Sequence, residues 1–295
     1  MDISACPLNL DVTLCCGQVF RWSKKGDWWY GVVGDSVLKI RPVAHELEFQ
    51  NAEENFIKNY FSMDHDLIGI AAEIGRDNYV MAALQEFWGL RLVRQEPWEC
   101  LISFICATYK SVAAIRQMLQ RLSMRLGERL AFEGEDFYAF PTPEKLANAS
   151  LQDLEQCGLG YRSPYVSETA RKIRAGKCDL QALGKMPYDQ AKKELCQYPG
   201  VGPKVADCVL LFSLGKLDAF PVDVRVKRLI LRYYSEHFPE SFVKKLTREE
   251  SLSNSEYERI CKFGKDYFGK YAGYAQEYLY HYERMKYWHS VGAGF

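Results

Sequence analysis

The chain has 295 residues and a mass of 34.1 kDa; 48% of the residues are hydrophobic and 26% are charged, with 38 basic and 38 acidic side chains. This composition excludes a disordered, collagenous or low-complexity protein, and the longest clean apolar run, around residues 209–214, is too short to span a bilayer. Ten cysteines and no visible export signal predict reduced thiols in a soluble intracellular protein.

The net charge of zero hides an uneven distribution along the chain. Residues 1–100 hold 9 basic and 15 acidic side chains, a net of −6, whereas residues 160–235 hold 14 and 7, a net of +7. A basic segment within a neutral chain is typical of a DNA-binding face, although ordinary solvated helix faces give the same counts. Charge alone leaves both interpretations open.

The N-terminal part has the pattern of short antiparallel strands. Strands are predicted over residues 18–22 and 28–33, joined by a turn at 24–27, and then over residues 37–40 and 46–49. From about residue 52 the hydrophobic period lengthens. We expect a small antiparallel β domain over residues 1–94.

From Pro97 onward nearly all of the chain is predicted to be helical. Serine caps predict helices that follow Ser111 and Ser150, and Ser163-Pro164 is expected to open a helix that closes at Gly176. Later helices are expected over 224–234, 255–268 and 271–287. The predicted fold class is therefore α+β, with a mainly α-helical second domain over residues 95–295.

The most informative stretch, residues 194–208, predicts two helices joined by a glycine-rich turn, with the whole hairpin over about 195–214. Gly200 and Gly202 allow backbone conformations closed to other residues, and their amides near a helix N-terminus suit a phosphate oxygen. With a proline on each side, this is a helix-hairpin-helix, which holds the DNA backbone without reading sequence.

Two chemically distinctive residues accompany the hairpin. Lys204 directly follows the turn of the hairpin. Asp223 lies in a proline-containing loop, residues 215–225, just before a predicted helix. Taken singly, Lys204 is more readily a solvated charge and Asp223 a helix N-cap. Together they are the two groups needed to cleave a glycosidic bond through a Schiff base.

The hairpin ending in Lys204, followed by the Pro-x-Asp of Pro221 and Asp223, resembles the helix-hairpin-helix-GPD superfamily of DNA glycosylases. Between about Leu8 and about Tyr282 the chain further resembles the 8-oxoguanine DNA glycosylase/AP lyase (Ogg) family. The similar motifs are CGQVFRW at 16–22, PWECLISFIC at 97–106, GLGYR at 158–162 and YAGYAQ at 271–276. Five matches in the family's order, with the hairpin among them, are highly specific.

The resemblance implies a bifunctional DNA repair enzyme that acts on double-stranded DNA. Lys204 would attack C1′ of the damaged nucleotide, displace 8-oxoguanine and form an imine, and β-elimination would then cut the strand. We expect desolvation or a cationic neighbour such as Arg225 to favour the neutral amine, and Asp223 to stabilise positive charge on the sugar. No redox or organic cofactor and no catalytic metal are needed; the resemblance leaves open a monovalent cation at the hairpin carbonyls.

The resemblance also implies a pocket for the flipped base. The carbonyl of Gly17 would accept a hydrogen bond from N7–H of 8-oxoguanine and repel N7 of guanine. Gln276 would read the Watson–Crick edge of the base, and Cys208 and Tyr280 would sandwich it, although the family usually has Phe at the last position. Taken alone, each residue is more readily a turn or packing residue.

Tyr161 would be the wedge that fills the gap left by the extruded nucleotide, and Arg162 would contact the orphaned cytosine. The chain departs from the family nearby. Tyr109-Lys110-Ser111 stand where many members carry asparagines, Ala114 replaces an arginine that helps to read the cytosine, and Arg225 stands where eukaryotic members usually have His. We therefore expect relaxed selectivity for the base opposite the lesion.

Three alternatives are weighed against this interpretation. An endonuclease III-like glycosylase usually carries a four-cysteine cluster near its C-terminus, whereas only Cys261 follows Asp223 here. A monofunctional alkylbase glycosylase would lack Lys204, and a non-catalytic hairpin module would need neither residue. We expect a monomer without membrane contact, in the cytoplasm and nucleoid of a prokaryote or in the nucleus of a eukaryote.

Overall fold

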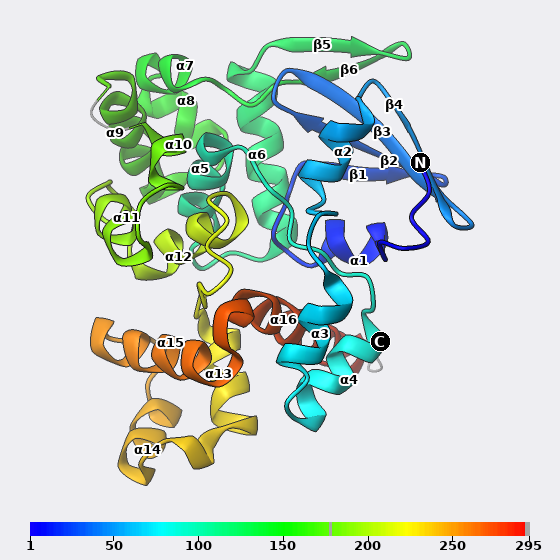
Figure 1. Ribbon diagram of the computed structural model, residues 1–295. Coiled ribbons are helices and arrows are strands. Elements are labelled where there is room, and N and C mark those ends of the chain that lie inside the picture. Colours follow the sequence, from blue (N-terminus) through cyan, green and yellow to red (C-terminus); the bar gives the residue numbers. More distant parts are fainter. Residues whose placement is uncertain (177–178, 293–295) are drawn as a thin grey trace.

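A computed structural model describes residues 1–176 and 179–292 of the chain. The short helix α1 (Leu10–Cys15) precedes a four-stranded antiparallel sheet in which the strands pair in chain order. Its members are β1 (Trp22–Lys25), β2 (Trp28–Val33), β3 (Ser36–Val43) and β4 (Glu46–Gln50). Figure 1 shows this sheet on one side of the molecule, with α1 beside it, and most of the helices on the other side, which confirms the predicted α+β class.

The first strand begins at Trp22 and not at Gln18, because Gln18 is a buried polar anchor. Its Nε2 donates to the carbonyls of Thr13 at 3.1 Å and Arg91 at 2.8 Å, and its Oε1 accepts from the backbone N–H of Val93 at 2.7 Å. These bonds hold the segment against the connection that leads to α5, away from β2. The strand expected over 18–22 is therefore wrong except at its last residue.

Three helices follow the sheet: α2 (Glu54–Tyr60), α3 (Leu67–Ile74) and α4 (Asn78–Glu86). The last two pack with the C-terminal helix α16 (Ala272–Gly292) and contribute to the main hydrophobic core. Asp77, the N-cap of α4, accepts at Oδ2 from the hydroxyls of Tyr234 at 3.0 Å and Tyr267 at 3.2 Å. The packing therefore crosses the boundary expected at residue 94.

The remaining helices surround a core that runs from the sheet side to the C-terminus. They are α5 (Pro97–Ala107), α6 (Val112–Leu126), α7 (Pro143–Asn148), α8 (Leu151–Gln156), α9 (Ser163–Arg174), α10 (Leu180–Leu183), α11 (Tyr188–Leu195), α12 (Pro203–Phe212), α13 (Val224–Tyr233), α14 (Glu240–Arg248) and α15 (Asn254–Phe268). Three single 3-10 turns, η1 (Gly160–Arg162), η2 (Ser235–His237) and η3 (Gly269–Tyr271), join some of them. Ser111 and Ser150 cap α6 and α8 through their hydroxyls, as predicted.

A second hairpin, β5 (Arg129–Phe132) and β6 (Glu135–Tyr138), interrupts the stretch that was expected to be helical. Its turn residue Glu133 accepts from Lys39 of β3 at 2.6 Å, and Phe137 stacks on Tyr30 of β2 with ring centroids 6.1 Å apart. The prediction of nearly continuous helix is wrong here, because the N-terminal sheet supplies the surface on which this hairpin packs.

The sequence also predicts reduced thiols and no segment that spans a membrane. The nine cysteines in the part of the chain that the structure describes are all free thiols; six of them are buried, and Cys196 is exposed. In the same part of the chain, no helix combines the length and the apolar character needed to cross a bilayer.

Candidate active site

The hairpin between α11 and α12 presents the N-terminus of α12 to solvent. Gly200 has a φ of +78°, and a Cβ added there would lie 2.9 Å from Cβ of Tyr165, so the turn requires glycine. The Thr169 hydroxyl of α9 donates to the Pro199 carbonyl at 3.1 Å, and this hydrogen bond stabilises the turn. Gly202 is the exposed N-cap of α12, which leaves the first amides of this helix open to an anion.

Lys204 lies half-buried in the first turn of α12. Its Nζ lies 5.0 Å from the centroid of the Phe104 ring, and Phe104 on α5 stacks in turn on Phe212 with centroids 5.5 Å apart. The lysine side chain also hydrogen-bonds with the thiol of Cys208, one turn further along α12. Burial raises the pKa of Cys208 to about 12, so the thiol is neutral. The amine is therefore bordered by a ring and a neutral thiol.

Asp223 is the N-cap of α13, which is the role that the sequence predicts for this residue when it is considered alone. Its Oδ1 accepts from the backbone N–H groups of Arg225 and Val226, each at 2.8 Å. Within the described residues no lysine, arginine or histidine forms an ion pair with this carboxylate. One oxygen thus serves the helix, and the other accepts no hydrogen bond from any residue that the structure describes.

Lys204 and Asp223 belong to one site because they act on the same neighbours. Both influence the pKa of Cys208 and the pKa of Glu277 on α16: the lysine lowers each value and the aspartate raises it. The structure therefore brings the start of α12, the start of α13 and the middle of α16 together around the two residues expected to be catalytic.

The other residues expected to hold a flipped base lie close by. Gly17 has a φ of +111°, and a Cβ added there would lie 3.5 Å from Cε1 of Tyr280 and 3.4 Å from Nη1 of Arg284. Gln276, one turn before Tyr280, is only 5% exposed, and its Oε1 has no hydrogen-bond partner among the described residues. An unpaired buried amide oxygen costs about 1–3 kcal/mol, which a polar ligand would offset.

Glu277 is a residue of this site that the sequence analysis missed. It is buried beside the Cys16 thiol, with which it hydrogen-bonds, and burial raises its pKa to about 7, with the charge of Asp223 adding to the effect. One face of the same helix carries Arg284, which donates to the Cys15 carbonyl. The available signal in the sequence was an acidic residue directly after Gln276, in an aromatic-rich stretch of α16.

The residues expected to contact the duplex are placed unequally. Tyr161 is 58% exposed, whereas Arg162 is buried. The Arg162 guanidinium donates to the carbonyls of Leu159 at 3.4 Å and of Thr108, and it lies 4.2 Å from the centroid of the Tyr161 ring. To contact a base, the Arg162 guanidinium would have to break its hydrogen bonds with these carbonyls.

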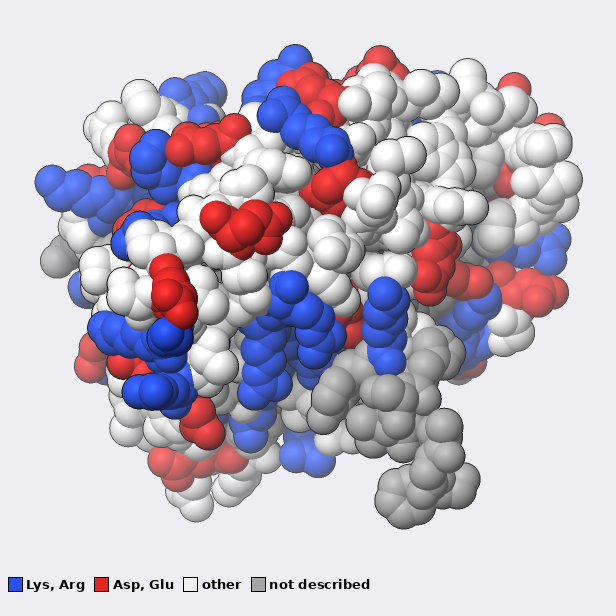
Figure 2. All heavy atoms as spheres, turned by 90° about the horizontal axis from the view of Figure 1, so that it is seen from below, with Lys and Arg blue, Asp and Glu red and all other residues white. Residues whose placement is uncertain are grey.

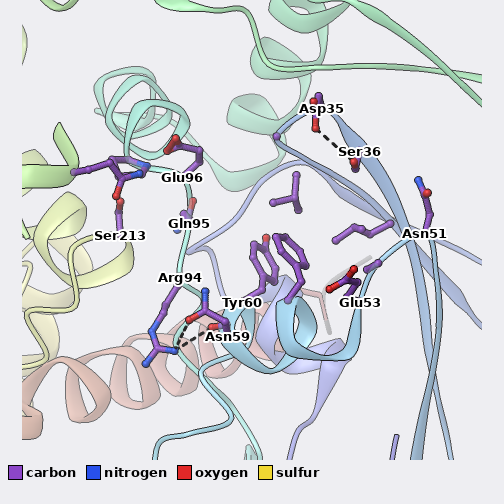
Figure 3. A pocket seen from close by; sticks show the side chains of 17 residues that line it. Asp35, Ser36, Asn51, Glu53, Asn59, Tyr60, Arg94, Gln95, Glu96 and Ser213 are labelled. Carbon is purple, nitrogen blue, oxygen red and sulfur yellow. Dashed lines mark hydrogen bonds between the residues drawn. The ribbon is translucent and has the colours of Figure 1, made fainter. Parts of the chain in front are cut away.

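A cavity of about 740 Å³ lies at the other end of α12 from Lys204. Figure 3 shows that it opens between the β2–β3 turn, α2 and the connection before α5, next to Ser213. Its lining includes three carboxylates, those of Asp35, Glu53 and Glu96, and one guanidinium, that of Arg94. An acidic lining repels phosphate, so we assign the site to the surroundings of Lys204 and not to this cavity.

Charge is distributed unevenly over the surface as well as along the sequence. Figure 2 shows one face that is mostly uncharged and carries scattered acidic and basic side chains, while lysine and arginine side chains gather in the lower middle of the view. A net charge of zero is therefore compatible with locally basic surface that attracts a polyanion.

Comparisons with known proteins agree with this geometry. The family model of the 8-oxoguanine DNA glycosylase N-terminal domain matches residues 1–101, and that of HhH-GPD superfamily base excision DNA repair proteins matches residues 102–252. The N-glycosylase/DNA lyase OGG1 of Arabidopsis thaliana is 30% identical over 92% of this chain and 76% of its own length. The N-glycosylase/DNA lyase of Saccharomyces cerevisiae is 33% identical over 78% of this chain and 66% of its own.

A solved structure is similar over nearly the whole chain. It is the 8-oxoguanine glycosylase/lyase of Clostridium acetobutylicum in complex with double-stranded DNA that contains cytosine opposite 8-oxoguanine. It matches with a TM-score of 0.85 and 30% identity and covers 95% of this chain and 93% of that chain.

Proposed function

Because the chain belongs to the 8-oxoguanine DNA glycosylase family of helix-hairpin-helix-GPD base excision repair proteins, we propose that it excises 8-oxoguanine from duplex DNA and then cleaves the strand as an AP lyase. The observation that most supports this function is that Lys204 and Asp223 both act on the buried Glu277, with Lys204 in the first helical turn after a hairpin whose exposed amides suit phosphate. DNA bound by the hairpin would bring a sugar to the amine.

The chemistry follows from these two side chains. The unprotonated Nζ of Lys204 attacks C1′ while the bond from C1′ to the base breaks, and the base leaves with the electron pair and takes up a proton. Opening of the sugar ring gives an imine between Nζ and C1′. Loss of a proton from C2′ then expels the 3′ phosphate, which cuts the strand. The uncommitted oxygen of Asp223 stabilises the positive charge that develops on the sugar.

Lesion recognition is proposed for the pocket between Gly17 and α16. The Gly17 carbonyl, to which no described residue donates, would accept N7–H of 8-oxoguanine, and the unpaired Oε1 of Gln276 would bind the Watson–Crick edge. Tyr280 lies against Gly17, and Cys208 lies beside Lys204, as two sides of a pocket for the flipped base require. Guanine, whose N7 is an acceptor, would meet repulsion at Gly17.

Relaxed reading of the opposite base is part of the proposal. The side chain of Ala114 has no hydrogen-bond donor, and the Arg162 guanidinium already donates to the Thr108 and Leu159 carbonyls. Each good base contact is worth about 1–3 kcal/mol, so excision opposite adenine, guanine or thymine should be appreciable. Some preference for cytosine is retained if the Arg162 guanidinium breaks its hydrogen bond with one of these carbonyls and contacts the cytosine instead.

The partners and surroundings follow from DNA as substrate. We propose a monomer that acts where the genome is, without membrane contact. The Gly200 and Val201 carbonyls, which accept no hydrogen bond from described residues, offer the hard oxygen ligands that a monovalent cation at the hairpin would use. Such a cation would fix the turn and take no part in the chemistry.

An endonuclease III-like enzyme has no support from the site. Cys261, the one cysteine that follows Asp223, is buried and donates to the Phe220 carbonyl at 3.1 Å. Within the described part of the chain, no three or more His, Cys, Asp or Glu side chains are grouped so that they could hold a metal ion.

The test uses single-turnover reactions on otherwise identical duplexes that carry 8-oxoguanine, an oxidised pyrimidine or no lesion. Base release is measured after hot alkali, and lyase activity is measured without it. We expect release and strand cleavage only with 8-oxoguanine. Release of the oxidised pyrimidine alone would support the endonuclease III-like alternative, and tight binding without release from any duplex would support a non-catalytic hairpin module.

A further inference from the structure

The reaction proposed for Lys204 needs a group that accepts a proton. An ammonium has no lone pair, so Nζ has to lose a proton before it attacks C1′. The groups that border the amine are the Phe104 ring and the thiol of Cys208, which burial keeps neutral. Neither a phenyl ring nor a neutral thiol accepts a proton near neutral pH, so the acceptor is another ionisable group of the site.

Glu277 lies on the face of α16 that meets the segment before β1. Tyr280 and Arg284, three and seven residues further along the helix and therefore on the same face, lie against Gly17. Glu277 itself hydrogen-bonds with the thiol of Cys16. Its carboxyl is thus placed next to the residue that precedes Gly17, whose carbonyl is proposed to bind the base.

The carboxyl of Glu277 also lies within range of the charges on the sugar side of the site. Lys204 lowers its pKa and Asp223 raises it, and these are the residues proposed to act at C1′. The other ionisable groups that interact with this carboxyl are those of Cys16, Arg284 and Tyr280. Glu277 is therefore near both the amine and the place proposed for the base.

Packing does not explain a carboxyl at this position. Glu277 is 2% exposed, and its Oε1 has no hydrogen-bond partner among the described residues, which costs stability. Burial, to which the charge of Asp223 adds, raises the pKa of Glu277 to about 7. A buried group that takes up and releases a proton near neutral pH has the property that a general base needs.

We propose that Glu277 takes the proton from Lys204 and then gives it to the departing 8-oxoguanine, an inference that rests on the proposed function. The Glu277 carboxylate takes one proton from the ammonium, which leaves Nζ with the lone pair that forms the bond to C1′. When the bond from C1′ to the base breaks, the base leaves with the electron pair and receives this proton from the Glu277 carboxylic acid. Glu277 thereby returns to the carboxylate.

The two carboxylates of the site then have separate roles. Asp223 has to stay charged in order to stabilise the sugar cation, and its Oδ1 accepts from the N–H groups of Arg225 and Val226. A carboxylate that had taken the lysine proton would have no charge left for the sugar. Glu277, whose Oε1 has no such bonds, exchanges the proton instead.

The test is the pH dependence of single-turnover excision by wild type and Glu277→Gln from about pH 6 to about pH 9. Gln keeps the size of the side chain but accepts no proton. The wild-type rate should rise to a plateau as the pH passes about 7. Glu277→Gln should be about 10²-fold or more slower at about pH 7, and this deficit should shrink about tenfold per pH unit above it, as the solvent removes the lysine proton instead.

The matched control is Glu283→Gln, on the same helix and paired with Arg232 at 2.6 Å, which should stay within about twofold of wild type at every pH. Urea unfolding and duplex binding, measured on the same preparations, should show that Glu277→Gln is folded and binds like wild type. A deficit of the same size at every pH would mean that Glu277 has a structural role and would overturn the proposal. A wild-type rate for Glu277→Gln at about pH 7 would overturn it as well.

Borohydride trapping on a duplex with a preformed abasic site separates deprotonation of the amine from release of the base. No base leaves this substrate, yet Lys204 still has to lose a proton to form the imine. We expect Glu277→Gln to be trapped slowly here too, with the same recovery at high pH. Normal trapping of Glu277→Gln would overturn the claim that Glu277 deprotonates Lys204.

These measurements also distinguish failure of this inference from failure of the proposed function. If trapping at the abasic site depends on Glu277 but wild type releases no 8-oxoguanine, the proposed excision fails and the role of Glu277 as proton acceptor stands. If wild type and Glu277→Gln release 8-oxoguanine at equal rates, the role of Glu277 fails and the proposed function stands.

Discussion

In the proposed mechanism the two oxygens of the Asp223 carboxylate have different roles, and a single substitution separates these roles. Asn at this position keeps the acceptor for the N–H groups of Arg225 and Val226, and Asn caps helices about as well as Asp. The charge needed at the sugar is lost. We expect Asp223→Asn to change the free energy of unfolding by less than about 0.5 kcal/mol and to slow single-turnover excision by about 10²-fold or more.

Thermal unfolding and excision are measured on the same preparation of Asp223→Asn. If stability falls strongly while excision stays near normal, the capping role is the whole explanation of Asp223. The matched control is Ser150→Ala at the N-cap of α8, which should lower stability by about 1 kcal/mol and leave excision unchanged.

The raised pKa of Glu277 predicts how the stability of the protein depends on pH. Burial raises its pKa from 4.5 to about 7, so between these pH values the folded protein holds a proton that the unfolded chain releases. Its contribution to stability is therefore present below about pH 4.5 and is lost as the pH rises through about 7. Glu277→Gln should unfold with the same free energy as wild type at pH 4.5 and with about 1–3 kcal/mol more at pH 8.

The measurement is urea unfolding of wild type and Glu277→Gln from pH 4.5 to pH 8. The difference between the two curves removes the other titrating groups, including the neighbouring Cys16 and Arg284. Parallel curves would mean that Glu277 does not titrate in this range. Glu283→Gln, further along α16 and paired with Arg232 at 2.6 Å, is the control and should not reproduce the gain.

At this scale the sequence revealed residues that belong to spaced motifs and concealed those whose role depends on tertiary contacts. Lys204 and Asp223 stand at fixed positions relative to the hairpin, so local pattern located both. The burial of Glu277 and the binding of the Arg162 guanidinium to the Thr108 carbonyl arise from segments far apart in the chain. No local pattern contains that information.

At the scale of elements, one buried carboxylate holds α12, the helix that carries Lys204, against its neighbours. Asp207 is fully buried, and its oxygens accept from Lys192 of α11 at 3.1 Å, from the Tyr257 hydroxyl of α15 at 2.6 Å and from the Tyr188 hydroxyl. Asp207 and Glu258 raise the pKa of Lys192 against the opposing effect of burial, so the lysine is charged. Three helices thus meet at one charge just beneath the hairpin.

Asp207→Asn removes this charge and leaves Lys192 with only the partly exposed Glu258, at 2.8 Å, as its ionic partner. Breaking a buried ion pair by removing one member costs about 3–5 kcal/mol, and we expect a loss of about that size in urea unfolding. The matched control is Asp266→Asn, whose exposed pair with Lys262 at 2.8 Å should cost less than about 0.5 kcal/mol. A loss below about 1 kcal/mol for Asp207→Asn would show that the network does not hold α12.

Elements that carry their own signals were predicted well, and those defined by distant partners were not. Capping serines and a proline in the first turn are local signals, so the starts of α6, α8 and α9 agree with the sequence. The hairpin β5–β6 depends on Lys39 and Tyr30 of the N-terminal sheet, and the chain before β1 depends on the bonds of Gln18 to Arg91 and Val93. Both errors come from partners that lie elsewhere in the chain.

At the scale of the whole molecule, the site is assembled from both ends of the chain. Gly17 follows α1, the amine and carboxylate begin α12 and α13, and Gln276 to Arg284 lie on α16. The main core contains residues from Cys16 to Leu279, and α3 and α4 hold α16 from the N-terminal side. The N-terminal part therefore supplies Gly17 to the proposed base pocket and is more than an attached domain.

Borohydride trapping on a duplex with 8-oxoguanine opposite cytosine tests the central claim, that Lys204 is the nucleophile. We expect wild type and the control Lys110→Gln to form a covalent protein–DNA product whose modified peptide contains Lys204. Lys204→Gln should form none and release no base, while it binds the duplex within a few-fold of wild type because phosphate contacts are spread over the basic segment. Undiminished trapping of Lys204→Gln, with the adduct on Lys110 or another amine, would contradict the assignment.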